Sequence, residues 1–311
     1  MFELLFPFFL FALFFLIFTI VWRIKARKYI SSSTVASAYD AWTQDKLLER
    51  LWGEHIHLGF YSSGKKNIDF RNAKVQFVHE LVKWSGLDKL PKGSRILDVG
   101  CGIGGSSRIL AKYYGFNVTG ITISPAQVKR ARELTPIELN CNFQVMDALD
   151  LKFENGSFDA IWSVEAGAHM NDKIKFADEM LRTLRPGGYL ALADWNSRDL
   201  IAKPPNLFEK LVLKQLLEQW VHPNFISINE FNNILKTNKN SAGRVISENW
   251  NFYTNPSWYD SIIEGIRRPF AILSLGPFAI IKSIREIPTI ILMNWAFKRG
   301  LMEFGVYKCR G

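Results

Sequence analysis

The chain has 311 residues, enough to bury a full hydrophobic core, and its 39 lysines and arginines against 29 aspartates and glutamates give a net charge of +10. With 24 phenylalanines and 10 tryptophans, and with basic residues that are mostly scattered, this composition favours an anionic membrane surface over nucleic acid. The cysteines Cys101, Cys141 and Cys309 lie far apart, which argues against a zinc site or a disulfide framework, and we expect no metal.

The chain begins with an apolar segment, Leu4–Trp22, which runs for 19 residues without a charge. At about 1.5 Å per residue, a helix of this length approaches the ~30 Å hydrocarbon core of a bilayer. Four basic residues follow at once: Arg23, Lys25, Arg27 and Lys28. A cleaved signal peptide carries its charges before the apolar region, so this order predicts a transmembrane anchor within residues 1–28 and a cytoplasmic catalytic domain. A buried core helix and a peripheral anchor are the alternatives.

The next part of the chain is rich in aromatic residues. Ile30–Ser37 is a polar linker, Tyr39–Tyr61 is dense in aromatic residues and histidine, and Asn67–Trp84 has helical spacing. Pro91, Lys92 and Gly93 then mark a turn.

From residue 93 to about residue 200, strand and helix patterns alternate. The expected strands are Arg95–Val99, Asn117–Ile123, Cys141–Asp147, Phe158–Val164 and Tyr189–Asp194. The expected helices are Ser106–Tyr114, Pro125–Leu134 and Lys173–Leu184, the last of them ended by a turn at Pro186, Gly187 and Gly188. This alternation predicts an α/β fold with a parallel sheet, helices on both faces and a ligand at the carboxyl ends of the strands.

After Trp195 the pattern is less regular. We expect helices at Leu207–Trp220 and Asn229–Lys236, and strands at Arg244–Phe252 and Leu301–Tyr307. Trp258–Lys298 is long, apolar and aromatic, but prolines and charges interrupt it, so it does not predict a second membrane span. Amphipathic helices that lie on a membrane or line an apolar pocket fit this segment, and ordinary core helices fit it equally well.

The sequence ILDVGCGIGG, residues 96–105, contains a glycine-rich turn between a strand and a helix. Its glycines satisfy both G-x-G-x-x-G and D-x-G-x-G-x-G. In a dinucleotide site an acid about 20 residues further on holds the ribose, but here the second strand ends in GITIS without one. The glycine pattern alone is therefore weak support for a nicotinamide cofactor.

Two acids at strand ends suggest a different ligand. Asp98, two residues before the first glycine, can accept hydrogen bonds from the ammonium group of an amino acid, as in the methionine part of S-adenosylmethionine. Asp147, after the third strand, can accept the amino group of an adenine. The alternative for either acid is a helix cap, which is about as common at a strand end.

Several segments carry a resemblance to a known family. ILDVGCGIGGSSRILAKYYG, GITISPAQVKRA, FDAIWSVEAGAHM and LRPGGYLALADWN resemble the successive motifs of class I S-adenosylmethionine-dependent methyltransferases. WGEHIHLGFY and SVEAGAHM resemble signatures of the tocopherol methyltransferase family, in particular its cyanobacterial-type branch. The resemblance covers Tyr39 to the C-terminus and implies a mostly parallel, seven-stranded sheet.

The resemblance implies a reaction and partners. The expected reaction is S-adenosylmethionine-dependent methylation of a ring carbon of 2-methyl-6-phytyl-1,4-benzoquinol, and of its solanesyl analogue, in tocopherol and plastoquinone synthesis. We expect a prenylated benzoquinol and the lipid bilayer of a photosynthetic or plasma membrane as partners, and no nucleic acid. The expected division is an anchor in residues 1–28, a helical cap in residues 29–92, a cofactor-binding core in residues 93–200, and acceptor-binding helices with the last strands in residues 201–311. The sequence predicts no oligomeric state.

The resemblance also implies the cofactor contacts. These are Tyr39, Asp98, Gly100, Cys101, Gly102, Gly104, Thr122, Ile123, Gln127, Asp147 and Ala148. The chain departs from most class I methyltransferases at Ile123, where they place an acid for the ribose hydroxyls. Thr122 and Gln127 are the contacts carried over at this point.

A quinol carbon becomes nucleophilic when the neighbouring phenol, whose pKa is near ~10, gives up its proton to a base. His169, a few residues after the fourth strand, is the first candidate for this base and Glu165 the second. His55 and His57 should point to opposite faces of an extended segment, so that one of them reaches the pocket. We expect His79 and His222 to be structural. With an unperturbed His169, activity should fall as the pH drops through ~6.5.

Three other functions compete with this one. A gamma-tocopherol or sterol-like lipid methyltransferase would keep the cofactor site and change the acceptor. An NAD-dependent quinone oxidoreductase would share the glycine turn but lacks its ribose acid here. A membrane scaffold without catalysis is disfavoured by the intact Asp98, glycine turn and Asp147.

Overall fold

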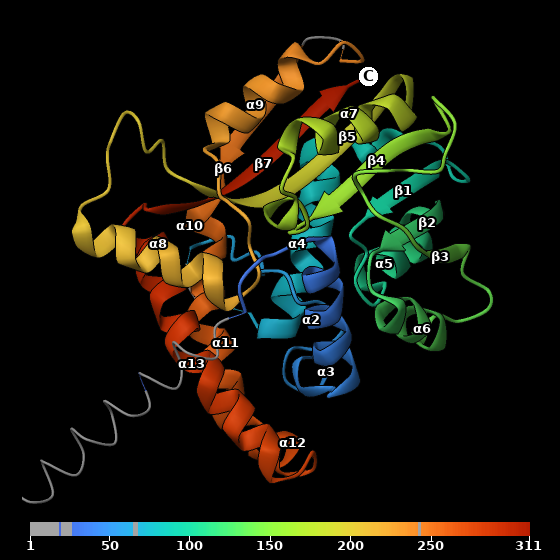
Figure 1. The fold of residues 1–311 in the computed structure, drawn as a ribbon. Coiled ribbons are helices and arrows are strands. Elements are labelled where there is room, and N and C mark those ends of the chain that lie inside the picture. Colours follow the sequence, from blue (N-terminus) through green and yellow to red (C-terminus); the bar gives the residue numbers. More distant parts are fainter. Residues whose placement is uncertain (1–18, 20–26, 65–67, 242–243) are drawn as a thin grey trace, which may run out of the picture.

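The computed structural model describes residue 19 and residues 27–64, 68–241 and 244–311. Within these ranges the chain folds around a seven-stranded sheet with helices on both faces (Figure 1). The transmembrane anchor expected over Leu4–Trp22 lies, apart from Thr19, outside the described residues. Of the helices that the structure describes, none combines the length and the apolar character needed to cross a bilayer.

The sheet has the strand order β3-β2-β1-β4-β5-β7-β6. Its strands are β1 (Arg95–Val99), β2 (Asn117–Thr122), β3 (Cys141–Val145), β4 (Phe158–Val164), β5 (Leu184–Ser197), β6 (Val245–Asn249) and β7 (Met302–Arg310). The strands from β3 to β5 pair in parallel, and β7 runs antiparallel to both β5 and β6. The expected α/β fold with a mostly parallel, seven-stranded sheet is therefore confirmed.

The direction in which the chain fills the sheet reverses between β1 and β4. Asp98 of β1 pairs with Gly120 of β2 on one side and with Trp162 of β4 on the other. In open α/β sheets a ligand crevice forms at the carboxyl ends of the strands beside such a reversal. The loops that follow β1, β2 and β4 therefore surround a common space.

The helices cover both faces of the sheet and one of its edges. They are α2 (Ser32–Gln44), α3 (Leu47–Trp52), α4 (Phe70–Ser85), α5 (Gly105–Tyr114), α6 (Pro125–Leu134), α7 (Lys173–Thr183), α8 (Leu207–Gln219), α9 (Ile228–Thr237), α10 (Asn251–Thr254), α11 (Pro256–Arg267), α12 (Pro269–Leu273) and α13 (Pro277–Lys298). Two 3-10 turns, Leu87–Lys89 and Gly167–His169, are the remaining helical elements of the described ranges.

Each face of the sheet packs against its own apolar core, because side chains alternate along a strand. On one face, Ile96 of β1 and Trp162 of β4 pack with Phe77 of α4. On the other face, Leu97 of β1 packs with Phe176 of α7. Burying one such side chain contributes about 1.5–3 kcal/mol, so the two cores hold the strand ends in fixed positions.

The part of the chain before the sheet folds into α2, α3 and α4. The expected polar linker Ile30–Ser37 was wrong from Ser32 onward, because Ser31 takes the N-cap position of α2 and its carbonyl accepts the amide of Thr34 at 3.0 Å. Helix α2 packs against α6, and α3 packs against α12. Both lie below the carboxyl edge of the sheet in Figure 1, where they cover the loops.

The boundary between α7 and β5 differs from the expectation. β5 begins at Leu184, directly after α7, so the expected turn at Pro186–Gly188 lies inside the strand. Its residues form an irregularity in the ladder, between the pairs Phe158–Leu184 and Ala160–Tyr189. Proline without an amide hydrogen and Gly187 with φ near +75° are tolerated at such a bulge.

The strand expected over Arg244–Phe252 ends at Asn249. The side chain of Asn249 accepts the amide of Asn251 at 2.9 Å, which starts helix α10. This local hydrogen bond competes with continuation of the strand, and the sequence pattern did not reveal it.

The apolar segment Trp258–Lys298 divides into two different environments. Ile290, Met293 and Phe297, in the second half of α13, are buried in the main core. Helix α12 and the first half of α13 instead extend away from the sheet to the lower tip of the molecule in Figure 1. The second half of α13 is therefore a core helix, whereas α12 and the first half of α13 form an exposed apolar surface.

Candidate functional site

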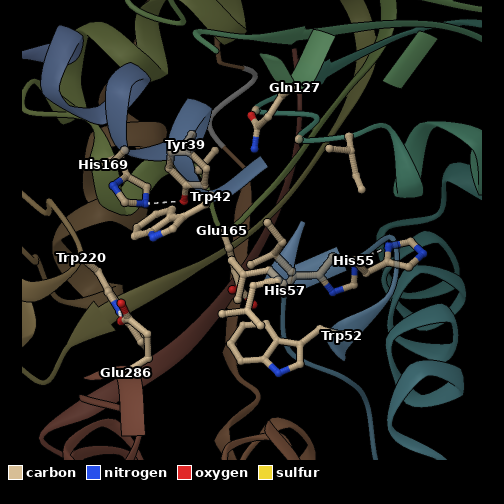
Figure 2. Close-up of a pocket in the computed structure, with 18 of the residues that line it drawn as sticks. Tyr39, Trp42, Trp52, His55, His57, Gln127, Glu165, His169, Trp220 and Glu286 are labelled. Atoms are coloured by element: carbon tan, nitrogen blue, oxygen red, sulfur yellow. Dashed lines mark hydrogen bonds between the residues drawn. The ribbon is translucent and has the colours of Figure 1, made fainter. Parts of the chain in front are cut away.

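A cavity of about 800 Å³ lies at the carboxyl ends of β1, β2 and β4. Its walls come from the loops of the sheet, from α2 and α3, and from α11 to α13. Figure 2 shows Tyr39, Gln127, Glu165 and His169 turned toward this space from four different parts of the chain. The sequence-predicted site residues Tyr39, His55, His57, Asp98, Gly100, Cys101, Gly102, Thr122, Ile123, Gln127, Asp147, Ala148, Glu165 and His169 all line it. The remaining one, Gly104, is the N-cap residue of α5.

The glycine turn brings the backbone against the cavity. Gly100, Gly102 and Gly104 all have positive φ, which L side chains rarely adopt. A Cβ at Gly100 would lie 2.3 Å from the Cβ of Ala166, so this position is closed by packing. A Cβ at Gly102 would meet only the side-chain nitrogen Nε2 of Gln127, at 4.0 Å, so it would occupy the open space of the cavity. This open space beside bare backbone fits a ligand that lies on the turn.

Asp98 is buried at the end of β1 and accepts a hydrogen bond from the Ser107 hydroxyl of α5, at 2.5 Å. Burial raises the pKa of its carboxyl to about 7, and the hydrogen bond from Ser107 opposes this shift. A buried carboxylate is stabilised by a cationic partner. The arrangement therefore fits a ligand that carries an ammonium group.

The wall after β2 is built from uncharged groups. The Thr122 hydroxyl donates to the Gln127 side-chain oxygen at 2.7 Å, and Ser124 caps α6 by accepting the amide of Gln127 at 3.1 Å. Asp40 reaches across from α2 and accepts hydrogen bonds from the Ser124 hydroxyl and from the amide of Ala126. An acid thus lies close to the position where the sequence lacks one, but it comes from the cap and binds the start of α6.

Tyr39 and His169 form a hydrogen-bonded pair across the cavity mouth. The Tyr39 hydroxyl lies 2.8 Å from Nε2 of His169, and Nδ1 of His169 lies 3.3 Å from the carbonyl oxygen of Val221 (Figure 2). A carbonyl can only accept, so Nδ1 carries the proton and Nε2 accepts from Tyr39. Burial lowers the pKa of His169 to about 4 and raises the pKa of Tyr39 above its ordinary value. Near neutral pH both side chains are therefore uncharged.

His222, which we expected to be structural, lies beside this pair. Its ring stacks on the ring of His169 with centroids 4.2 Å apart, and it lines the cavity. Burial of its ring, and after it the nearby His169, lowers the pKa of His222 well below its ordinary value. Its position depends on the loop after α8, which no sequence motif marks.

Glu165, directly after β4, is half-buried in the cavity wall and has a strained backbone, with φ near +53°. Its carboxylate accepts the amide of Leu58 at 2.7 Å, which joins the cap to the sheet. Burial raises its pKa to about 8. A carboxyl group held in this way can exchange a proton near neutral pH.

His55 and His57 do not point to opposite faces, and that expectation was wrong. Nε2 of His57 lies 3.0 Å from Nδ1 of His55, and both residues line the cavity (Figure 2). The chain bends at His57 instead of running extended, so alternation does not apply. Burial lowers the pKa of His57 to about 3 and that of His55 well below its ordinary value.

A group of tryptophans that the sequence did not single out forms one wall. Trp195, Trp220 and Trp258 pack together with ring centroids 5.4 to 6.3 Å apart, and Trp195 also contacts His222. Aromatic walls of this kind suit a flat ring with an apolar substituent. Because these tryptophans lie dozens of residues apart in the sequence, no local pattern marks them as a group.

The end of the cavity away from the glycine turn is lined mostly by apolar side chains, although Asp45, Lys282, Arg285 and Glu286 also line it. Its lining includes Leu47, Leu48 and Leu51 of α3, Ile272 and Leu273 of α12, and Ile280, Ile284, Ile287 and Ile290 of α13. The cavity therefore offers a polar end near Asp98 and Glu165 and a long apolar end near α12. In the described ranges, no cluster of three or more histidine, cysteine or acidic side chains is placed to hold a metal ion.

Comparisons with known proteins agree with this arrangement. Residues 97–192 match the family model of a methyltransferase domain. The chain is 54% identical over 288 residues to the 2-methyl-6-phytyl-1,4-hydroquinone methyltransferase of Synechocystis sp., a match that covers 93% of this chain and 91% of that protein. It is 34% identical over 276 residues to the chloroplastic tocopherol O-methyltransferase of Arabidopsis thaliana, covering 85% of this chain and 78% of that protein.

A solved structure shares the fold. The Haemonchus contortus phosphoethanolamine N-methyltransferase 2, in complex with phosphomonomethylethanolamine and S-adenosylhomocysteine, superposes with a TM-score of 0.72 at 17% identity. The match covers 90% of this chain and 60% of that one. At this identity the likeness concerns the fold alone.

Proposed function

This chain belongs to the methyltransferase family that contains 2-methyl-6-phytyl-1,4-hydroquinone methyltransferase and tocopherol O-methyltransferase, and we infer that it methylates a ring carbon of a prenylated 1,4-benzoquinol. The observation that carries this inference is the 54% identity along 91% of the hydroquinone methyltransferase, against 34% to the tocopherol enzyme. The acceptor is 2-methyl-6-phytyl-1,4-benzoquinol, with the solanesyl analogue as a second substrate. These reactions belong to tocopherol and plastoquinone synthesis.

The methyl donor in this proposal is S-adenosylmethionine. Asp98 would hold its ammonium group, and the open space beside Gly102 would admit it onto the backbone. The paired side chains of Thr122 and Gln127 offer hydrogen bonds to its ribose or methionine part, and Asp147 to its adenine. When bound, this donor supplies a methyl group on a sulfonium, and the transfer leaves S-adenosylhomocysteine.

The residues of this chain would activate the acceptor by moving a proton. A quinol hydroxyl passes its proton to the Tyr39 oxygen, whose own proton passes to Nε2 of His169, while Nδ1 stays on the Val221 carbonyl. Electron density on the ring carbon next to the deprotonated oxygen then rises, and that carbon forms the new bond to the methyl group. The ring carbon then loses its proton to solvent, which restores the aromatic ring, and His169 returns its proton through Tyr39 to the quinol oxygen.

The cavity suits the acceptor in size and polarity. The tryptophan wall of Trp195, Trp220 and Trp258 can pack on the quinol ring, and the apolar end between α3 and α13 can take the start of the prenyl tail. At about 0.8 kcal/mol per buried CH₂, the rest of the tail favours the bilayer over water. We therefore also propose that the enzyme works at a photosynthetic or plasma membrane, with residues 1–28 as anchor and the catalytic domain on the cytoplasmic side.

Transfer of a labelled methyl group from S-adenosylmethionine tests the proposal. We expect the phytyl and solanesyl benzoquinols to be labelled at comparable rates, and gamma-tocopherol much more slowly. Titration calorimetry should detect binding of S-adenosylmethionine and no binding of NADH, which separates this function from a quinone oxidoreductase. Preferred labelling of gamma-tocopherol would show that the chain acts as a tocopherol methyltransferase. Binding of NADH would overturn the assignment of S-adenosylmethionine as the donor.

A further inference from the structure

The exposed apolar surface on α12 and the first half of α13 has no part in the chemistry described above. We propose that this surface docks on an anionic lipid bilayer and that the prenyl tail enters the cavity from the bilayer beside it. The second half of the proposal rests on the proposed function, because that function names what enters the cavity. We define the docking surface by six residues: Phe270, Leu273, Phe278, Ile281, Ile284 and Ile287.

The residues of the docking surface are strongly exposed. Phe270 is 81% exposed, Phe278 76% and Ile281 64%. These residues lie on one helical extension at the tip of the molecule, away from the sheet (Figure 1). A soluble surface rarely leaves so many large apolar side chains together, and such a patch marks a contact with another apolar phase.

The course of the chain identifies the bilayer as the occupant. Arg27, the first residue of the range that begins there, forms a 2.7 Å ion pair with Glu286 of α13, and its guanidinium stacks over the Trp42 ring at 4.9 Å. Arg27 therefore lies beside Ile287 of the docking surface, and in the sequence it follows the uncharged segment Leu4–Trp22 by only five residues. A segment of this composition is suited to a bilayer, so both apolar parts would reach the same membrane.

The charges beside the docking surface fit anionic lipid. A second cavity of about 430 Å³ is lined by Arg50, Arg71 and Arg268, together with Glu49, Phe270 and Ala271. Nη2 of Arg71 donates to the carbonyl oxygens of Arg50 and Leu51, whereas its Nε is buried with no hydrogen-bond partner among the described residues. Burial, and after it the Arg268 charge, lowers the pKa of Arg71. Glu49 is already paired with Arg130. Arg268 is paired with Glu264 at 2.7 Å. The positive charges of Arg50 and Arg71 therefore favour the phosphate of a lipid headgroup beside Phe270.

The docking surface is also the rim of the active-site cavity. Leu273, Ile284 and Ile287 line the cavity while remaining 37% to 54% exposed. A tail that passes between them would move from hydrocarbon to an apolar wall without crossing water. This removes most of the unfavourable transfer of a long prenyl chain.

A fluorescence experiment on the full-length chain tests the docking alone. An environment-sensitive dye is attached at Ile281→Cys and, as a matched control, at Ile137→Cys in the loop between α6 and β3, where the isoleucine is fully exposed. Labelling of the unsubstituted protein measures how much dye its three native cysteines take up. With vesicles of phosphatidylcholine and about one third phosphatidylglycerol, the dye at position 281 should shift to the blue and be quenched by acyl-chain nitroxides. The dye at position 137 should do neither.

Kinetics test the entry of the tail. The double variant Phe278→Asp/Ile281→Asp should raise KM for the phytyl benzoquinol in vesicles by about tenfold or more, because charges in the bilayer are unfavourable. Turnover of a methylated benzoquinol without a prenyl tail should stay unchanged, and Ile137→Asp should alter neither. Arg50→Gln should reduce the preference for anionic over neutral vesicles roughly fivefold, and Lys236→Gln on α9 should not.

The outcomes separate the two proposals. A dye at position 281 that responds no more than the one at position 137 overturns the docking, whatever the activity. The dye could also become buried without lipid, in a dimer that forms with rising protein concentration. The surface would then be a contact between two copies of the chain, and the docking would be overturned as well. Equal KM values for the double variant and the unsubstituted protein overturn the tail entrance. A response of the dye without methylation of any benzoquinol supports the docking and contradicts the proposed function instead.

Discussion

The Tyr39 hydroxyl donates a 2.8 Å hydrogen bond to Nε2 of His169, and this bond joins the cap helix α2 to the loop after β4. The histidine that the sequence suggests as a base is therefore reached through a tyrosine. Because Nδ1 faces the Val221 carbonyl, the lone pair on Nε2 is the proton acceptor of the pair. One contact thus both holds α2 against this loop and orients the candidate base.

The first prediction concerns this pair. His169→Ala and Tyr39→Phe should each lower turnover by roughly 10²–10⁴-fold, and His169→Ala should leave the affinity for S-adenosylmethionine almost unchanged. The double variant should lose little more than the worse single variant, because the two residues act as one relay. His79→Ala is the matched control, since His79 makes the same 2.8 Å contact with Tyr114 outside the cavity. Additive losses in the double variant would show that the two residues act separately.

The pH profile distinguishes His169 from Glu165. A base acts unprotonated, so its contribution is present above its pKa and lost below it. The pKa of His169 is lowered to about 4 and that of Glu165 raised to about 8, in both cases by burial. With His169 as base, turnover at saturating substrates should stay level from pH 8 to about pH 5. A steady decline below pH 8 would assign the role to Glu165, and one centred near ~6.5 would indicate a histidine that is not desolvated.

Asp98 should make donor binding depend on pH. Its pKa is raised to about 7 by burial, so the free protein holds a proton there at lower pH, whereas an ammonium partner requires the carboxylate. Affinity for S-adenosylmethionine should therefore fall about tenfold per pH unit below pH 7, with release of a proton on binding. Calorimetry in buffers of different ionisation enthalpy measures both. Asp98→Asn should bind weakly at every pH, and Gly102→Val should abolish binding by filling the space beside the turn; normal affinity in either would refute the assignment.

Asp40 should hold helix α2 against the start of α6, beside the cavity wall formed by Thr122 and Gln127. It accepts hydrogen bonds from Ser124 and Ala126 at the positive end of α6. Asp40→Ala should raise the dissociation constant of S-adenosylmethionine about tenfold and increase hydrogen exchange in α2, since charged hydrogen bonds contribute about 1.5–3 kcal/mol. Asp69→Ala, which removes the cap of α4, is the control and should affect stability only. Unchanged hydrogen exchange in α2 would show that Asp40 does not hold this helix in place.

The sequence predicted the sheet and the cofactor loops well for a physical reason. Strands buried on both faces and glycines with positive φ leave local marks, so β1, β4 and the turn at Gly100–Gly104 were placed correctly. The candidate residues Asp98, Glu165 and His169 line one cavity, because they lie at or soon after the ends of neighbouring parallel strands. The start of α2 was missed because its serines suit both a linker and a helix cap.

Contacts between distant parts of the chain could not be predicted. The tryptophan wall, the stacking of His222 on His169 and the reach of Asp40 to α6 each join residues that are far apart in sequence. The pKa values of His169 and Glu165 follow from burial, which depends on the closed cap. These features arise from packing, and no short motif encodes them.

The most direct test of the central claim is the position of the transferred methyl group. The full-length protein is supplied with carbon-13-methyl S-adenosylmethionine and 2-methyl-6-phytyl-1,4-benzoquinol in vesicles, and the product is examined by NMR and mass spectrometry. We predict a single new methyl group on a ring carbon, with both quinol oxygens unmethylated. A methyl group on oxygen, or no transfer to this acceptor while another lipid is methylated, would contradict the proposed function.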